Sequence, residues 1–326
     1  MISFELGVED LADTRFALSC LNETVYSLRV LRDPGLHALH LPWRASVLGR
    51  LDPRDADRLV ALVGRRLALP DFLTPRPAAF AAPLPEAMSL VRGTPPWIVR
   101  RDLEAALIEG PIPADDASAA RFRDDTCDLL RRYWELAVEP VWPRMRLVLE
   151  ADMTYRARRL AVGGARLLFA DMHPNLRWHE GVLHIDKMIG RHRVAASGRG
   201  LLLMPSVFAH KPAPPVSPEE PPLLTYPSRA VATLWSPAPV PDATALTSLL
   251  GAPRAALLGL LAEPLPTVEL ARRLGVTPSA VSQHLRVLYA TGLVTRARDG
   301  RHVLYRRSPL GDRLAAQPHP RRPEAP

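Results

Sequence analysis

The chain has 326 residues, of which 47% are apolar, and a formal net charge of +8. It is too long for one typical domain and too apolar to be wholly disordered. Two distant cysteines argue against a disulfide scaffold and fit a reducing compartment. The N-terminus lacks the pattern of a signal peptide, and no segment approaches the ~20 apolar residues that span a bilayer. We therefore expect a cytoplasmic, two-domain protein that does not enter a membrane.

Residues 1–210 predict an N-terminal α+β domain that is mostly helical. The opening SFEL favours a short strand ahead of a helix that begins near Glu9. Apolar residues at three- and four-residue spacing predict helices over 56–67, 98–108 and 120–162, the last broken near Pro140 and Pro143. Short apolar segments bounded by Gly or Pro predict strands at 182–186, 193–196, 200–208 and 230–235.

Proline is concentrated after this domain. Ten of the thirty-five residues from 211 to 245 are proline, which predicts a stiff connection over 211–244. A second domain is expected over 245–316, followed by a disordered polar tail over 317–326.

The positive charge lies mainly in this second part. Residues 246–326 carry twelve arginines and five acidic residues, whereas the preceding 245 residues carry thirty basic and twenty-nine acidic ones. Such a concentrated basic segment is typical of a protein that binds a polyanion.

Two helices are predicted at the start of the second domain. The first spans 253–262, with proline in its first turn. The second spans 267–274, with Thr267 as its N-cap and Glu269 near its positive end. Gly275 should end this helix, and Val276 is expected to be the apolar plug of a tight turn.

A third helix follows, capped by Thr277 with Pro278 in its first position. Val281, Leu285 and Leu288 fall on one face, within about 60° of each other at 3.6 residues per turn. Small polar, amide and guanidinium groups, which suit base edges and phosphates, occupy the opposite face: Ser279, Ser282, Gln283 and Arg286. The pattern predicts a helix-turn-helix with this helix as the reader of DNA.

A basic hairpin is predicted immediately after the reader helix. Gly292 ends the helix, and Asp299-Gly300 favours a tight turn between strands at 293–298 and 302–307. The hairpin carries Arg296, Arg298, Arg301, Arg306 and Arg307. These arginines could pair with Asp299 or Asp312, but they outnumber those acids, which favours a DNA-contacting wing.

This segment resembles the ArsR/SmtB group of bacterial repressors over about seventy residues. The shared run is SxxSxHLxxLxxxGLVxxxRxGRxxxY, from Ser279 to Tyr305. The resemblance implies a homodimeric winged helix-turn-helix regulator that binds an inverted repeat in double-stranded promoter DNA. It places the following residues at the DNA, with Thr277 at the start of the reader helix: Ser279, Ser282, Gln283, His284, Arg286, Arg298 and Arg301. His284 could instead tie the helix to the wing.

The metal chemistry of that group does not carry over to this sequence. Members that sense metals have cysteines on the helix before the reader, where this chain has VELARRL at 268–274. The other metal site of the group lies on a C-terminal helix, where this chain offers Asp312 alone. Since a metal site needs several converging ligands, we expect no metal and no cofactor.

The N-terminal domain resembles those of uncharacterised actinobacterial regulators, which suggests effector sensing, dimerisation or both. Common enzyme motifs such as GxSxG and HExxH are absent from the sequence. Two clusters are candidate ligand sites, although polar helix or loop residues also explain them: His37 with His40, and His173, His179, Glu180 and His184. Cys127 and the six tryptophans are expected in the core. We expect no enzyme; the alternatives are a metabolite enzyme fused to a DNA-binding module and a winged helix that binds protein.

Overall fold

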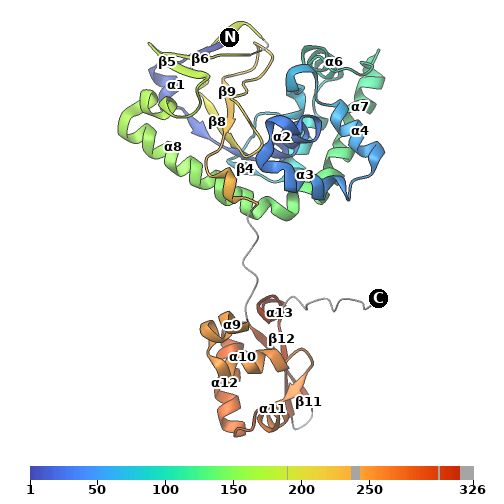
Figure 1. Ribbon diagram of the computed structural model, residues 1–326, viewed down its shortest axis with the longest axis vertical. Helices are drawn as coiled ribbons and strands as arrows, with labels where there is room; N and C mark the ends of the chain where they lie inside the picture. The colour runs from blue at the N-terminus through green and yellow to red at the C-terminus, as the bar shows by residue number, and fades with distance from the viewer. Residues whose placement is uncertain (189, 236–242, 300–301, 316–326) are drawn as a thin grey trace. The chain divides into compact units, whose positions relative to one another are not determined.

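The computed structural model describes residues 1–188, 190–235, 243–299 and 302–315, and the chain divides into two compact units, Met1–Ser236 and Pro237–Pro326 (Figure 1). The first unit combines helices with short sheets, and the second is a small helical unit with a hairpin. The predicted α+β fold class, with helix predominating, is therefore confirmed.

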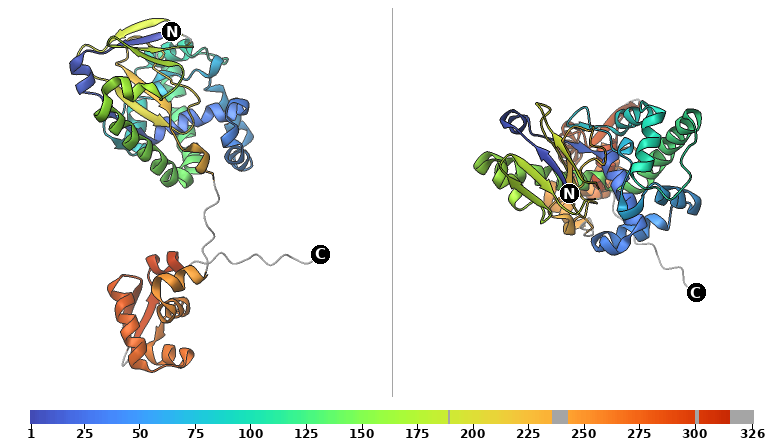
Figure 2. Two further views of the ribbon diagram at one scale, coloured as in Figure 1. Left: turned by 60° about the vertical axis from the view of Figure 1, so that its left-hand side comes forward. Right: turned by 90° about the horizontal axis from the view of Figure 1, so that it is seen from above.

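Several helices of the first unit pack around one central helix, α2 (Cys20–Arg32). Almost every residue of α2 is buried, and Ser19 caps this helix by accepting a hydrogen bond from the Asn22 N–H at 3.0 Å. The right-hand view of Figure 2 and Figure 1 both show α2 to α7 gathered at one side of the unit and the strands at the other. The helices are α1 (Val8–Ala12), α2 (Cys20–Arg32), α3 (Leu41–Leu48), α4 (Pro53–Ala61), α5 (Leu84–Arg92), α6 (Pro96–Ala105), α7 (Asp116–Tyr133) and α8 (Trp142–Ala170).

The strands of the first unit pair across long stretches of sequence. In one sheet β1 (Ile2–Glu5) lies between β6 (Val182–Ile185), antiparallel, and β7 (His192–Ala195), parallel, with β5 (Leu176–His179) beyond β6. A second, parallel sheet has the order β2 (Arg15–Phe16), β8 (Leu202–Ser206) and β9 (Leu223–Pro227), and β3 (Leu18–Ser19) pairs with β4 (Ala81–Ala82). The strands predicted at 3–6, 182–186, 193–196 and 200–208 are thus confirmed, within one or two residues at their ends.

The predicted helix break and the predicted strand at 230–235 have different outcomes. The break predicted near Pro140 and Pro143 is confirmed, because a π-helical turn (Trp134–Val138) and a 3-10 turn (Glu139–Val141) separate α7 from α8. The strand predicted at 230–235 is wrong. Val231–Thr233 is a 3-10 turn, and Leu234 is buried in the core around α2, so tertiary packing overrides the local apolar pattern.

The first unit extends further than the sequence suggested. Much of the predicted connection belongs to it, because β9 pairs with β8 and the backbone N–H groups of Val216 and Ser217 donate to the Asp71 carboxylate at 3.0 and 2.8 Å. The prolines of this segment therefore stiffen a part of the first unit, and the segment is not a free linker. Residues 236–242 of the connection and the tail predicted at 317–326 lie outside the described residues.

The second unit is built on one small apolar core. Leu257, Leu270, Leu285 and Leu293 are among its buried residues. The helices and strands are α9 (Ala243–Leu250), α10 (Ala252–Leu260), β10 (Leu265–Pro266), α11 (Thr267–Leu274), α12 (Pro278–Ala290), β11 (Val294–Asp299), β12 (His302–Arg307) and α13 (Pro309–Ala315), with the strands in the order β10-β12-β11.

The last helix of this unit packs closely onto the start of the hairpin. The Ser308 hydroxyl donates to the Gly292 carbonyl at 2.6 Å and accepts from the Gly311 N–H at 3.1 Å. A methyl group on Gly311 would overlap the carbonyl oxygen of Leu293, so only glycine fits there.

Within the described ranges, no helix is both long and apolar enough to cross a bilayer.

Candidate nucleic-acid interface

The turn between α11 and α12 follows from its sequence. Gly275 has φ of 67°, in the left-handed region that glycine enters without a steric penalty. The Val276 N–H donates to the Ala271 carbonyl at 3.1 Å, which closes the end of α11. Val276 itself is 49% exposed. It is therefore not the apolar plug that the sequence suggested.

The start of α11 also differs from the prediction. Thr267 is the first helical residue, and its side chain makes no cap hydrogen bond, because the chain enters the helix directly from β10 with Pro266 in the N-cap position. Glu269 lies in the first turn as expected. Hydrogen bonds from Arg272 and Arg273 lower the pKa of the Glu269 carboxyl to about 2.

Thr277 caps α12 as predicted. Its Oγ1 accepts a hydrogen bond from the Ala280 N–H at 3.3 Å and lies 3.0 Å from the Ser279 hydroxyl. Both hydroxyl groups are exposed at the positive end of the helix. This end of α12 therefore offers polar groups and a helix dipole that both favour a phosphate.

The two faces of α12 differ as the spacing predicted. Val281, Leu285 and Leu288 are 1% exposed or less and pack in the core of the unit. The four polar side chains predicted for the opposite face are exposed, and His284 is half-buried at its edge: Ser279, Ser282, Gln283, Arg286 and His284. Within the described ranges Arg286 forms no ion pair. Its guanidinium group therefore remains available to an external acceptor.

The hairpin after α12 divides the predicted wing arginines between two faces. Arg296 stands opposite Tyr305 in the ladder, and its guanidinium carbon lies 4.4 Å from the centre of the Tyr289 ring at the end of α12. Arg298, two residues on, shares this face because side chains alternate along a strand. Arg306 lies on the other face, opposite Thr295.

Arg307, another arginine of the predicted wing, pairs with Asp312 at 3.0 Å, so an acid of the chain partly neutralises its charge. Arg301 and the turn residue Gly300 lie outside the described residues.

Among the histidines singled out from the sequence, His37 and His40 are packing residues and His179 lies at a turn. His37 and His40 are buried, the Trp235 indole N–H donates to His40 Nδ1 at 3.0 Å, and burial lowers the pKa of both imidazoles to about 4. His179 and Glu180 are exposed at the turn between β5 and β6. In the part of the chain that the structure describes, no group of three or more His, Cys, Asp or Glu could hold a metal ion.

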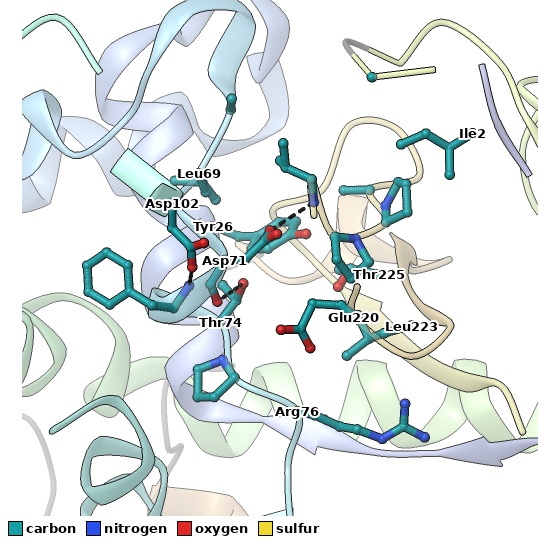
Figure 3. A pocket seen from close by; sticks show the side chains of 18 of the residues that line it. Ile2, Tyr26, Leu69, Asp71, Thr74, Arg76, Asp102, Glu220, Leu223 and Thr225 are labelled. Atoms are coloured by element: carbon teal, nitrogen blue, oxygen red, sulfur yellow. Dashed lines mark hydrogen bonds between the residues drawn. The ribbon is translucent and has the colours of Figure 1, made fainter. Parts of the chain in front are cut away.

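One feature of the first unit escaped sequence reasoning. A cavity of about 400 Å³ lies beside α2, and its lining includes Arg29, Asp71, Lys211 and Glu220 (Figure 3). These residues come from widely separated parts of the chain, so no local motif could reveal them.

Comparison with known proteins bears on the second unit. A family model described as a helix-turn-helix domain matches residues 254–297, which run from α10 into β11. A search of curated proteins finds no match to the chain. The match agrees with the capped reader helix, and together they support a DNA-binding regulator of transcription.

Proposed function

We propose that the protein is a sequence-specific transcriptional repressor of the ArsR-like winged helix-turn-helix type. The observation that carries the proposal is the division of α12 into a buried aliphatic face and an exposed polar face with Ser279, Gln283 and Arg286. An α-helix fits the major groove of B-DNA, where amide and guanidinium groups make paired hydrogen bonds to adenine and guanine. Arg296 and Arg298 extend this polar surface along the hairpin.

The proposed binding form is a homodimer on an inverted repeat of promoter DNA in the cytoplasm. A twofold dimer places two reader helices about one helical turn of DNA apart. Apolar side chains exposed on α9 and α13 support such a self-association: Leu249, Leu310 and Leu314 are 70%, 42% and 38% exposed. A dimer seated on a promoter represses by excluding polymerase.

The test is binding of the full chain to DNA from upstream of its own gene, with a Gln283→Ala plus Arg286→Ala variant. Each good bidentate base contact contributes about 1–3 kcal/mol to discrimination. The double variant should therefore bind its natural site on the order of 10²- to 10⁴-fold more weakly. Arg131→Ala, which removes one exposed charge from α7 of the first unit, is the matched control and should retain binding.

Equal affinity of the double variant and the parent protein would refute the assignment of α12 as reader. Failure of the parent protein to bind any duplex at low salt would instead favour a winged helix that binds protein. Derepression of a reporter after deletion of the gene tests the sign of regulation, and reduced expression would make the protein an activator.

The first unit is proposed to bind an effector and not to act as an enzyme. The acids of its cavity support this reading, because the Asp71 and Asp102 carboxylates accept hydrogen bonds from backbone N–H groups and so act as structural anchors. The alternative, an enzyme fused to a DNA-binding module, gains some support from Glu220, which also lines the cavity. If the parent protein consumes a metabolite of a cell extract and the Glu220→Gln variant does not, the result would favour the enzyme.

A further inference from the structure

The cavity of the first unit has the size and lining of a ligand site. Its volume of about 400 Å³ falls within the usual range for small-molecule pockets. Its walls come from α2, the segment 66–76, the start of α6 and the proline-rich segment 211–225. Figure 3 shows the Glu220 side chain reaching into this space from the proline-rich wall, across from Asp71 and Thr74.

Arg29 is the most unusual group of the lining. It is only 7% exposed, its Nε–H donates to the Leu67 carbonyl at 2.9 Å, and its Nη1 is buried without a hydrogen-bond partner. The guanidinium carbon lies 4.2 Å from the centre of the Tyr26 ring. Arginine stays protonated even when buried, so Arg29 is a buried cation whose Nη1 lacks an acceptor.

The acids of the cavity do not neutralise Arg29. Asp71 accepts from Val216 and Ser217, and Asp102 accepts from the Phe72 N–H at 2.8 Å and pairs with Arg101 at 3.0 Å. Across the described ranges, no ion pair includes Arg29. The N–H groups on Arg29 Nη1 are therefore left to pair with a bound ligand.

A second cation lies near Arg29. Burial, together with the neighbouring Arg29 and Arg66, lowers the pKa of the Lys211 ammonium group. The lining as a whole has four cationic side chains and three acidic ones: Arg29, Arg66, Arg76 and Lys211, against Asp71, Asp102 and Glu220. Because Asp102 already pairs with Arg101, which does not line the cavity, the lining cations exceed the remaining acids, and this excess favours an anionic ligand.

The backbone beside Arg29 supports a built site. Arg66 and Leu67 have φ of 56° and 60°, in the left-handed region that non-glycine residues seldom adopt. This conformation holds the Leu67 carbonyl against Arg29 Nε. Such backbone strain concentrates at ligand-binding sites, where it fixes functional groups in position.

The remaining lining is largely apolar and includes Leu69, Phe72, Ile98, Met188 and Leu223. We propose that this cavity binds a small organic acid with one carboxylate and an apolar body, the carboxylate paired with Arg29 and Lys211. Arginine suits a carboxylate because its two N–H groups match the two carboxylate oxygens. A doubly charged phosphate fits less well, because Glu220 and Asp71 share the same small space.

The inference concerns binding by the first unit and does not depend on DNA recognition. Its test measures the thermal midpoint and the calorimetric Kd of the full chain, without DNA, against medium-chain and aryl-substituted monocarboxylates. The primary amides of the same skeletons are the matched ligands. Acids should bind and raise the midpoint of the first unit, and the amides should bind at least tenfold more weakly.

Arg29→Met is the decisive variant. It replaces an unpaired buried charge with an apolar chain of similar length, which is commonly neutral or stabilising, so the ligand-free variant should fold. A charge-assisted hydrogen bond contributes about 1.5–3 kcal/mol, so the variant should bind acids at least about tenfold more weakly. Lys211→Met is the second variant if Arg29→Met does not fold, and Arg131→Met, on the exposed surface of α7, is the control.

Three results would overturn the proposal. They are no binding by any acid of the series, equal binding of acids and amides, or unchanged acid binding by both Arg29→Met and Lys211→Met.

Discussion

The two units of the molecule keep their charges in different places. In the first unit Glu23, Arg29, Asp102, Asp152 and Arg156 are all buried. In the described part of the second unit no charged side chain is buried, and Arg286 of α12 and Arg298 and Arg306 of the hairpin are exposed. Buried charges respond to proton uptake and to ligands that reach them, whereas exposed charges respond to ionic strength. The first unit should therefore be sensitive to pH and small molecules, and the second to salt and polyanions.

The largest effect that would test this contrast is the pH dependence of the first unit. Burial raises the pKa of the Glu23 carboxyl from 4.5 to about 8, although Glu23 Oε2 accepts from the Val207 N–H at 3.0 Å. Since the folded pKa lies above the unfolded one, the stabilising contribution is complete below pH 4.5. It is lost as the pH rises to about 8.

The expected loss from Glu23 within that window is up to about 1.4 kcal/mol per pH unit. The buried imidazoles of His37 and His40 act in the opposite direction below pH 6.5, because burial lowers their pKa to about 4. Urea unfolding of the first unit at a series of pH values measures it. Glu23→Gln should remove the Glu23 contribution to the measured slope, while Glu86→Gln, on the exposed side of α5, should leave the slope intact. A slope unchanged by Glu23→Gln would mean that the buried charges of the first unit do not set its pH response.

The next prediction tests whether the two units, each with its own hydrophobic core, unfold independently. Leu285 is fully buried among residues of the second unit alone. Leu285→Ala should therefore cost about 2–5 kcal/mol, as large-to-small core substitutions do, and lower only the melting transition of that unit. Leu28→Ala, at a fully buried position of α2, should do the reverse. Equal shifts of both transitions in either variant would show that the units unfold together.

A smaller effect is expected at the start of the reader helix. Thr277→Ala removes a side-chain cap and should destabilise the second unit by about 0.5–2 kcal/mol. Thr267→Ala is the natural control, because the Thr267 side chain makes no cap hydrogen bond and its loss should change little. Thermal melting of the two variants compares them directly, and equal destabilisation would contradict the assigned role of Thr277.

The smallest effect is the salt dependence of DNA binding. If Arg298 neutralises one phosphate, Arg298→Ala should reduce the slope of log affinity against log salt by about 0.9. Arg306→Ala removes the same charge from the other face of the hairpin and should leave the slope nearly unchanged. Fluorescence anisotropy at several salt concentrations measures both, and a larger change for Arg306 would place the opposite face of the wing at the DNA.

Features that depend on interactions between residues close in the sequence could be predicted, whereas features that depend on long-range contacts could not. Around α12, the Thr277 cap, Gly275 and the spacing of Val281, Leu285 and Leu288 act within a few residues, so each could be predicted. In the first unit β1 pairs with strands some 180 residues later, and the partners Ile2 and Ile185 carry no local signal of each other. The cavity was missed for the same reason.

The incorrect predictions at 230–235 and in the proline-rich segment also result from long-range contacts. The apolar run at 230–235 favours a strand by itself, but Leu234 packs against the core around α2 and Trp235 bonds to His40. The proline-rich segment predicts a linker by composition, but Asp71 holds it against the first unit from 145 residues earlier in the chain. Neither of these long-range contacts could be predicted from the local sequence pattern.

Both native cysteines are buried, and burial raises the pKa of each thiol to about 11. Thiol-directed dyes, which attack through the thiolate, will therefore leave Cys20 and Cys127 largely unlabelled at neutral pH. One cysteine introduced at exposed Ser89 and another at exposed Ser248 would accept a fluorophore pair without removing either native thiol. Energy transfer between the two dyes would then report, in a single molecule, whether an organic acid or a promoter fragment changes the separation of the two units.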